Sequence, residues 1–252
     1  MTPPPGRLLL VPNTLDLGSE PVDLADVLPH GVLREAARLR CWVAENAKTT
    51  RAFLKRVDAV VPLARPLQQV QIRELPRPAK GGAASVPAAA WHELLAPAVA
   101  GEDLGLISEA GLPAVADPGA ALVAAAHAAG VPVQPLPGPS SLLLALAASG
   151  LNGQSFAFVG YLPQDAAALA AQLRELDARS RREGQTQIAI QTPYRNAALL
   201  QALLAHLAPT TRLAVASALT LPGGWCRSRT VQDWRRDPPV LDRRPAVFLF
   251  LG

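Results

Sequence analysis

Three turns rich in glycine, proline and small residues constrain the fold of this chain more than any other feature. They are SEAGLPAVADPG (residues 108–119), PGPSS (residues 137–141) and GYLP (residues 160–163), each directly after a run that predicts a buried strand. Turns of this composition let the backbone approach a ligand closely. One such turn is ordinary, whereas three along one α/β unit indicate a composite site for a small molecule.

Hydrophobic periodicity predicts alternating strands and helices along the chain. The predicted strands cover residues 8–11, 40–44, 103–108, 131–136, 156–161, 186–190, 212–216 and 246–251. The predicted helices cover residues 23–28, 32–39, 49–57, 89–99, 120–129, 139–148, 165–182 and 196–207. Residues 62–88 are rich in proline, glycine, glutamine and alanine, and within them residues 77–87 are predicted to be a loop; residues 223–230 are predicted to be a hairpin turn. Because the rhythm changes near residue 150, we expect two α/β domains, residues 1–150 and 151–252, with the ligand cleft between them.

Composition limits the class of protein. Half of the 252 residues are hydrophobic and 17% are charged, which allows a sizeable core and argues against a disordered chain. The net charge of +4 permits an RNA partner, although an arginine-rich solvated surface also explains it. Cys41 and Cys226 form no disulfide framework, and the four histidines lack metal-ligand spacing, so we expect no metal. With no visible signal peptide or membrane-spanning run, we expect a cytoplasmic protein without a membrane partner.

These blocks, together with TPYR at residues 192–195, resemble the tetrapyrrole methylase family in order, spacing and strand context. The resemblance implies two α/β domains of that family's type, S-adenosylmethionine as cofactor in the cleft between them, and a homodimer. Within the family, the chain is most similar to the branch that contains ribosomal RNA ribose 2′-O-methyltransferases of the small subunit. It is closer still to a shorter methyltransferase subgroup that carries SEAG, NGQSFAFVGYLP and TPYRN. The branch implies ribosomal RNA as the methyl acceptor.

Three loops depart from the pattern of the ribosomal RNA enzymes. Residues 12–18 read PNTLDLG in place of P-x-P-I-G-N-L, so the Gly-Asn pair is missing. Residues 44–48 read AENAK in place of A-E-D-T-R, which keeps the acid at Glu45, and residues 191–195 read QTPYR in place of E-S-P-H-R. Because these loops face the substrate in the family, two alternatives stay open. One is a methyltransferase for a small molecule or tetrapyrrole, and the other is a non-catalytic cofactor-binding protein.

Methyl transfer from a sulfonium is an in-line displacement, so the protein has to position the cofactor and exclude water. The resemblance implies that residues 108–119 lie along the methionine and ribose of the cofactor, and that residues of the second domain face the adenosine. Helix capping also explains Asp117 and the two serines, and core packing also explains the apolar residues. The predicted cofactor-binding residues are Pro12, Ser108, Glu109, Gly111, Leu112, Pro113, Val115, Asp117, Ser140, Ser141, Gln191, Thr192, Ala218, Leu219 and Pro245.

If the acceptor is a hydroxyl, a base assists the removal of its proton. Glu45 is the predicted base because it follows an apolar strand and matches the family acid, with an ordinary surface charge as the alternative. Tyr161 can stack on the acceptor or hydrogen-bond to it, and it can equally be a core aromatic. Lys48, Arg51 and Arg195 are the predicted substrate-binding residues, since cations can bind phosphate; for the two on the helix, a solvated face is the alternative.

Overall fold

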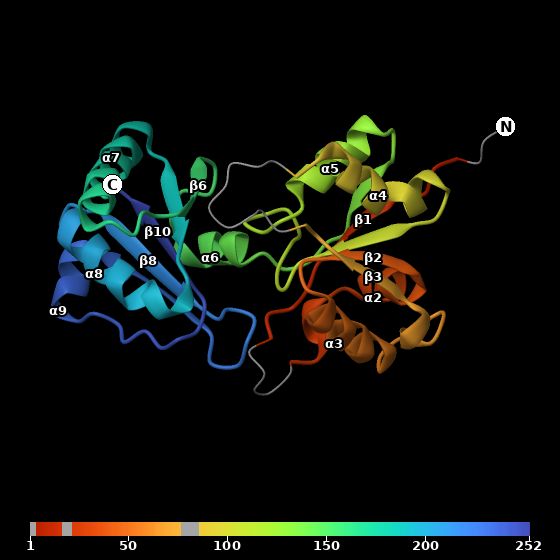
Figure 1. Ribbon diagram of the computed structural model, residues 1–252. Coiled ribbons are helices and arrows are strands. Elements are labelled where there is room, and N and C mark those ends of the chain that lie inside the picture. Colours follow the sequence, from red (N-terminus) through yellow and green to blue (C-terminus); the bar gives the residue numbers. More distant parts are fainter. Residues whose placement is uncertain (1–3, 17–21, 77–85) are drawn as a thin grey trace. The chain divides into compact units, whose positions relative to one another are not determined.

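The computed structural model shows two compact units, residues 1–139 and residues 140–252, each built around its own five-stranded sheet (Figure 1). The residues that the structure describes are 4–16, 22–76 and 86–252. Most of the predicted loop at residues 77–87, and Gly18 of the loop after the first strand, lie outside the described residues. Two α/β domains are therefore confirmed.

The boundary between the two units lies earlier in the chain than the one expected near residue 150. The structure assigns helix α6 (Ser141–Ser149) to the second unit, because Leu142 and Leu146 of this helix share a buried cluster with Ala214 and Val247 of the second sheet. A glycine, Gly150, ends α6 in the left-handed conformation. The rhythm change after α6 therefore marks the end of the first element of the second unit.

The first unit is a parallel sheet with helices on both faces. The strands, in the order β3-β2-β4-β1-β5, are β1 (Leu8–Val11), β2 (Cys41–Ala44), β3 (Gln71–Glu74), β4 (Leu104–Ile107) and β5 (Val133–Pro135). The helices are α1 (Leu24–Val27), α2 (His30–Arg38), α3 (Ala47–Asp58), the 3-10 turn η1 (Leu67–Gln69), α4 (Ala88–Val99) and α5 (Ala120–Ala128). Figure 1 shows α2 and α3 against one face of the sheet and α4 and α5 against the other. This cover explains why β1, β2 and β4 are runs of buried apolar residues.

Local sequence signals account for most of these elements. The side chain of Asp23 accepts a hydrogen bond at the start of α1, and that of Asn46 caps α3. Strand β3, an edge strand of sequence QIRE, was not among the predicted strands. Because three of its four residues are exposed, β3 shows none of the apolar alternation by which strands are recognised.

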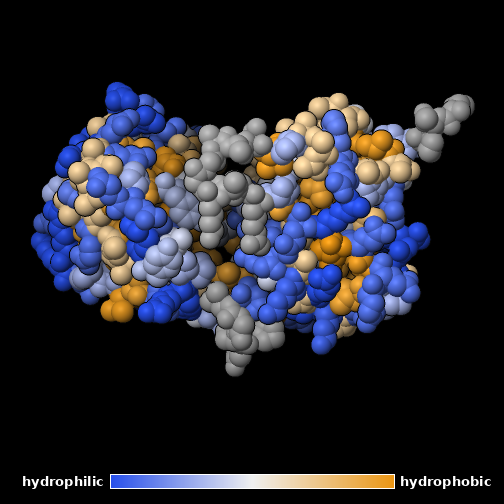
Figure 2. All heavy atoms as spheres, viewed as in Figure 1, coloured by the Kyte–Doolittle hydropathy of each residue, from blue (hydrophilic) through white to orange (hydrophobic). Residues whose placement is uncertain are grey.

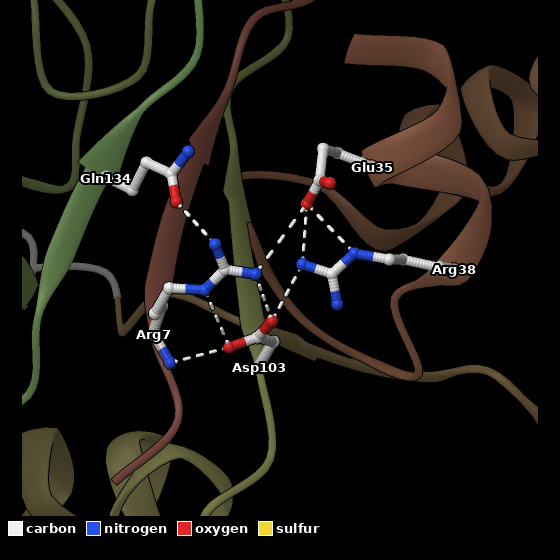
Figure 3. Close-up of polar contacts among 5 residues, drawn as sticks. All are labelled: Arg7, Glu35, Arg38, Asp103 and Gln134. Atoms are coloured by element: carbon white, nitrogen blue, oxygen red, sulfur yellow. Dashed lines mark hydrogen bonds and ion pairs between the residues drawn. The ribbon is translucent and has the colours of Figure 1, made fainter. Parts of the chain in front are cut away.

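A network of charged side chains closes the amino edge of this sheet (Figure 3). Asp103, just before β4, accepts hydrogen bonds from the backbone N–H and the guanidinium of Arg7, both at 2.7 Å. Arg38 on α2 donates to the same carboxylate at 2.7 Å and also pairs with Glu35, while Arg7 reaches Gln134 in β5 at 2.7 Å. Although burial alone would raise it, hydrogen bonds from Arg7 and Arg38 hold the pKa of Asp103 well below its usual range. The network thus joins β1, β4, β5 and α2.

Replacing Asp103 with asparagine is expected to lower the free energy of unfolding at pH 7 by about 2 kcal/mol. The folded pKa of Asp103 is depressed, so its stabilisation is present above the unfolded pKa of about 3.9 and is lost as the pH falls through the folded value. Urea unfolding at pH 7 and pH 3 measures this, and the difference between wild type and variant should shrink at pH 3. Glu93→Gln is the control, because its pair with Arg73 is exposed. An equal loss in both variants would contradict the role of the network.

The second unit is a mixed sheet with α6 on one face and the other helices on the opposite face (Figure 1). The strands, in the order β6-β7-β10-β8-β9, are β6 (Phe156–Tyr161), β7 (Thr186–Ile190), β8 (Arg212–Ser217), β9 (Trp225–Thr230) and β10 (Ala246–Leu251). The helices besides α6 are α7 (Ala166–Glu183), the 3-10 turn η2 (Pro193–Arg195), α8 (Asn196–His206) and α9 (Val231–Arg236). Strands β6 and β7 are parallel, whereas β10 is antiparallel to both β7 and β8.

One prediction for this unit is wrong, since residues 225–230 form strand β9 and the chain reverses before them. The alternating exposed arginines of β9 mask the strand pattern. In the described part of the chain, no helix is long and apolar enough to cross a membrane.

Candidate functional site

The carboxyl edge of the first sheet gathers several of the predicted site residues. Strands β2, β4 and β1 are neighbours and run in parallel, so the residues that follow them lie at one edge. These residues are Glu45 after β2, Ser108 and Glu109 after β4, and Pro12 and Asn13 after β1. In parallel α/β sheets this edge is where ligands bind.

Asn13 holds the β1 and β4 loops together. Its backbone exchanges two hydrogen bonds with Gly111, both at 2.9 Å. Its side-chain amide donates to the carbonyl oxygens of Ser108 and Glu109 at 3.1 and 3.0 Å. Asn13 is buried and was not among the predicted site residues, because its role depends on contacts about 95 residues away in sequence. An asparagine two residues after a buried strand, directly after a proline, is the signal that could have indicated it.

Three carboxyl groups lie close together at this edge. Oε2 of Glu45 accepts a hydrogen bond from the backbone N–H of Glu109 at 3.1 Å, which ties the end of β2 to the end of β4. Burial, with the negative charges of Glu45 and Glu109, raises the pKa of Asp117 to about 7. Near neutral pH, Asp117 is therefore present in both protonation states, as a group that takes up or releases a proton has to be.

The loop that carries Asp117 has an unusual backbone. Gly111 and Gly119 have φ values of 70° and 133°, and the non-glycine residues Ala114 and Ala116 have φ values of 66° and 64°. Left-handed conformations at alanine cost free energy and concentrate at functional sites. Helix α5 begins at Ala120 with Gly119 as its N-cap, so the alternative role of Asp117 as a helix cap is wrong.

The apolar residues of this loop differ in their exposure. Pro113 is buried, Leu112 is partly exposed, and Val115 is 44% exposed. Core packing therefore accounts for Pro113 and leaves Val115 available to a ligand. Ser108 is buried, and among the described residues its hydroxyl has no hydrogen-bond partner. A buried hydroxyl without a partner calls for an explanation, and a ligand group supplies one.

Helix α3 begins beside Glu45 and presents basic side chains to solvent. Lys48, Arg51 and Lys55 are exposed on this helix at helical spacing, on one side of it. Arg56 differs, because its guanidinium pairs with Asp16 and donates to the Val22 carbonyl oxygen. The predicted substrate-binding residues Lys48 and Arg51 thus belong to an exposed basic stripe, which we define as Lys48, Arg51 and Lys55.

The second sheet also has an edge at which several predicted site residues lie close together. Since β6, β7 and β8 run in one direction and β10 runs against them, the residues after these three strands lie beside the residue before β10. The predicted residues at this edge are Tyr161, Gln191, Thr192, Ala218, Leu219 and Pro245.

Contacts at this edge fix the backbone around it. The Ala218 N–H donates to the Pro245 carbonyl oxygen at 3.1 Å, and the Thr192 N–H donates to Oε1 of Gln191 at 3.0 Å. The hydroxyl of Thr192 is buried and has no partner among the described residues, which repeats the situation of Ser108. Tyr161 is 58% exposed and is therefore not a core aromatic.

Three further predicted residues have other surroundings. Ser140 is the N-cap of α6, but its side chain makes no capping hydrogen bond, and Ser141 is exposed in the first turn. Of the two serines, therefore, only Ser140 stands at the capping position, and its side chain does not act as a cap. Arg195 donates to Oε1 of Gln164 at 2.9 Å, which holds η2 against the residues after β6.

Comparison with known proteins identifies bacterial relatives of this chain. The chain is 54% identical over 65 residues to the ribosomal RNA small subunit methyltransferase I of Xylella fastidiosa, which is 26% of this chain and 24% of that protein. It is 39% identical over 122 residues to the protein of the same name from Vibrio cholerae, which is 48% of this chain and 41% of that one. The matches thus span less than half the length of these two relatives.

Solved structures share the whole fold at low identity. A uroporphyrin-III C-methyltransferase of Thermus thermophilus, complexed with S-adenosyl homocysteine, has a TM-score of 0.54 at 18% identity, covering 98% of both chains. A cobalt precorrin-4 methyltransferase has a TM-score of 0.55 at 12% identity, covering 98% of this chain and 94% of that one. At such identities the likeness establishes the fold alone.

The family itself is recognised over most of the chain. The pattern of the Tetrapyrrole (Corrin/Porphyrin) Methylases matches residues 32–231, a span that runs from α2 to the start of α9 and includes all three carboxyl groups at the edge of the first sheet. The resemblance inferred from the glycine- and proline-rich blocks is confirmed. The chain belongs to the tetrapyrrole methylase family.

Proposed function

We propose that this protein is an S-adenosylmethionine-dependent methyltransferase that acts on RNA, with ribosomal RNA as the leading acceptor. The observation that carries the proposal is the carboxyl edge of the first sheet, where a strained glycine loop, three carboxyl groups and an exposed basic stripe occur together. Family membership and the relatives named as ribosomal RNA methyltransferases support it. This activity would place the protein in the cytoplasm.

The residues at this edge fit the proposed cofactor. The nearest neighbour of a Cβ built on Gly111 is the Pro139 carbonyl oxygen, 4.0 Å away, so the turn leaves space above its backbone. The buried Ser108 hydroxyl offers a hydrogen bond that the described protein atoms leave unused. When bound, S-adenosylmethionine supplies a methyl group on a positively charged sulfur. The carboxylates of Glu45 and Glu109 favour a positive charge at this edge.

The side chains at this edge can also handle the proton that a hydroxyl acceptor loses. The carboxylate of Glu45 is held in one orientation by the Glu109 N–H, which suits a base that has to meet the acceptor in a defined position. Asp117, with its pKa raised to about 7, can take up a proton at one of its carboxyl oxygens near neutral pH. We keep Glu45 as the proposed base and give Asp117 the role of the nearby proton acceptor.

The basic stripe on α3 suits an RNA acceptor. Its cations begin directly after the Asn46 cap, next to the proposed base, and no ion pair joins Lys48, Arg51 or Lys55 to an acid among the described residues. Unpaired cations beside a catalytic edge can bind the phosphates that flank a target nucleotide. Arg195 and Tyr161 of the second unit are the other proposed substrate contacts.

Calorimetric titration of S-adenosylmethionine into wild-type protein and Gly111→Trp tests the cofactor. The wild type is expected to bind, and the variant is expected not to, because the indole would fill the space above the turn. Gly130→Trp is the matched control, since Gly130 has almost the same φ (69°) with nothing within 4 Å and lies between α5 and the amino end of β5. If the wild type fails to bind, the proposed function is wrong. If both variants lose binding, the site at Gly111 is wrong.

Reversing two charges of the basic stripe tests the acceptor. Lys48→Glu with Arg51→Glu is expected to reduce methylation of RNA from cells that lack the gene, and to leave cofactor affinity unchanged. The slope of log affinity against log salt should become shallower by roughly 0.7–0.9 for each phosphate that the variant no longer binds. Arg34→Glu, an exposed position on α2, is the control. Unchanged RNA methylation in the double variant would contradict the role of the basic stripe, whereas a wild type that methylates no RNA would favour an acceptor without phosphates.

A further inference from the structure

Strand β9 is an edge strand whose exposed side chains include two arginines. It lies at one end of the second sheet and pairs with β8 alone among the described strands. In its sequence WCRSRT, Arg227, Ser228 and Arg229 are exposed. Hydrophilic side chains cover most of the visible surface of each unit, so charge alone does not distinguish β9 (Figure 2). The way in which its arginines are supported does.

Each arginine of β9 lies over an indole ring. The guanidinium carbon of Arg227 is 5.3 Å from the centre of the Trp225 ring. That of Arg229 is 5.0 Å from the centre of the Trp234 ring, which is buried and donates its N–H to the Leu213 carbonyl oxygen at 2.8 Å. Stacking on a ring holds one face of a guanidinium and leaves the N–H groups at its edge to donate to a ligand. Both arginines are therefore partly ordered before a ligand binds, which lowers the entropic cost of binding.

The two arginines share one face of the sheet at a fixed spacing. Arg227 pairs with Val215 and Arg229 with Leu213, and both partners belong to the buried cluster that includes residues of α7, α8 and α9. Alternate residues of a strand lie on the same face about 7 Å apart. Successive phosphates of an extended single strand of RNA have a similar spacing, and a guanidinium binds a phosphate through two parallel hydrogen bonds. One RNA strand can therefore place neighbouring phosphates on the two arginines.

Strand β9 begins at the edge of the second sheet that carries predicted site residues. Trp225, its first residue, pairs with Ser217, which directly precedes the predicted residue Ala218. Two hydrogen bonds of 2.9 Å tie the turn before β9, from the Leu221 N–H to the Ala218 carbonyl oxygen and from the Gly224 N–H to the Leu221 carbonyl oxygen. An RNA strand that follows β9 therefore has one end at this edge.

The ion pairs around β9 leave its arginines available to phosphate. No acid of the described residues pairs with Arg227, and the carboxylate of Asp237, which pairs with Arg229 at 2.9 Å, is 78% exposed. An exposed pair of this kind is weak, so a phosphate can replace the carboxylate. The arginines of α9 have other partners, because Arg235 donates to a carbonyl oxygen of α8 at 2.7 Å and Arg236 pairs with an acid of its own helix.

We propose that β9 binds a single strand of RNA, with Arg227 and Arg229 on successive phosphates, as a contact for the nucleotides that flank the methylated one. This inference rests on the proposed function, because it takes RNA as the acceptor. It adds to the basic stripe on α3 a second binding surface, on the other unit. Since phosphates carry no sequence information, β9 contributes affinity and orientation without selecting bases.

Removing both charges tests the surface. Arg227→Gln with Arg229→Gln is expected to bind a short single-stranded RNA about tenfold more weakly than the wild type. The slope of log affinity against log salt should become shallower by about 0.7 for each phosphate lost. The control is Arg179→Gln with Arg182→Gln, because these exposed arginines of α7 also pair with acids and should leave RNA affinity unchanged. A double variant that binds as the wild type does, or a control that loses as much affinity, would overturn the proposal.

A second variant is expected to gain affinity, a result that misfolding cannot produce. Asp237→Asn removes the carboxylate that competes with phosphate for Arg229, so single-stranded RNA should bind about threefold more tightly. Glu175→Gln is the matched control, since Glu175 pairs with Arg179 at the same distance of 2.9 Å on α7, and its RNA affinity should not change. Unchanged affinity in Asp237→Asn would show that Arg229 does not bind phosphate.

Methylation of RNA from cells that lack the gene separates this inference from the proposed function. If both hold, the double variant at Arg227 and Arg229 should have a higher KM for RNA, with kcat and the affinity for S-adenosylmethionine unchanged. If the variant and the wild type methylate RNA with the same KM, the role of β9 is wrong and the proposed function stands. If β9 accounts for RNA binding but the wild type methylates no RNA, the proposed function is wrong and the binding surface stands.

Discussion

Replacing Asp117 with asparagine is expected to stabilise the protein at pH 8 while abolishing methyl transfer. The pKa of Asp117 is raised to about 7, mainly by burial and then by the charges of Glu45 and Glu109, whereas the unfolded chain has a value of about 3.9. The folded state therefore holds a proton that the unfolded state releases. Stability is greatest below pH 4 as far as this group is concerned, falls between about pH 4 and pH 7, and is lost above the folded value.

Asparagine carries no charge at any pH, so the stability of the variant does not fall with rising pH on account of this side chain. A difference of about three between the folded and unfolded pKa corresponds to about 4 kcal/mol of folding free energy. Because the side chain is partly exposed, we expect about 2 kcal/mol. Urea unfolding at pH 4 and pH 8 measures it, and the gain should be present at pH 8 and absent at pH 4. Asp237→Asn, an exposed carboxylate, is the control and should leave unfolding unchanged at both values. A variant that is no more stable than wild type at pH 8 would show that Asp117 ionises normally.

The same group links stability to the proposed chemistry. Glu45→Gln removes one of the two charges that raise the pKa of Asp117, so the fall in stability between pH 4 and pH 8 that Asp117 causes should become smaller in this variant. A carboxyl group that is costly to ionise in the folded state is a feature that selection for stability alone would remove. This is why we assign the strained loop around Asp117 to function.

Much of the fold could be predicted from the sequence because its signals are local. Buried apolar runs such as β1 and β4 are bounded by polar, proline and glycine residues. That these runs are strands, and where they begin and end, therefore follows from the hydrophobic pattern and from the residues on either side. Strands β3 and β9 could not be predicted in this way, since their exposed polar residues leave no alternation to detect. Both are edge strands, and pairing with β2 and β8 is what makes them strands.

The site was predictable in outline and not in its contacts. Ser108, Gly111 and Asp117 were expected at the end of β4, and the structure has them at that edge. The raised pKa of Asp117 could not be predicted, because it depends first on the burial of the side chain in the folded loop and then on Glu45, from another strand, lying nearby. Asn13 was missed for the same reason, since its bonds to Ser108 and Glu109 join distant parts of the chain. Whether the named residues bind cofactor or RNA stays a prediction.

Replacing Gly138 with alanine is expected to lower the free energy of unfolding by about 1–3 kcal/mol and to weaken cofactor binding. A Cβ on Gly138 would overlap the Cβ and Cγ atoms of Pro12, a buried residue whose ring cannot rotate away. The strain would pass to Asn13, the next residue, whose backbone is bonded to Gly111. Gly31→Ala is the matched control, because the nearest atom to its Cβ is a flexible arginine group 4.0 Å away.

Hydrogen exchange separates this mechanism from a general loss of stability. In Gly138→Ala the amides of Asn13 and Gly111 should exchange faster than in wild type, while those of β1 keep their relative protection. In Gly31→Ala all of these amides should exchange as in wild type or more slowly, because alanine favours the helix. If Gly138→Ala speeds all amides of the first unit equally, the substitution weakens the core and the link from Pro12 through Asn13 to Gly111 is not the path. If only the Asn13 and Gly111 amides respond, and cofactor affinity falls with them, the close packing of Gly138 on Pro12 is what holds the proposed cofactor loop in shape.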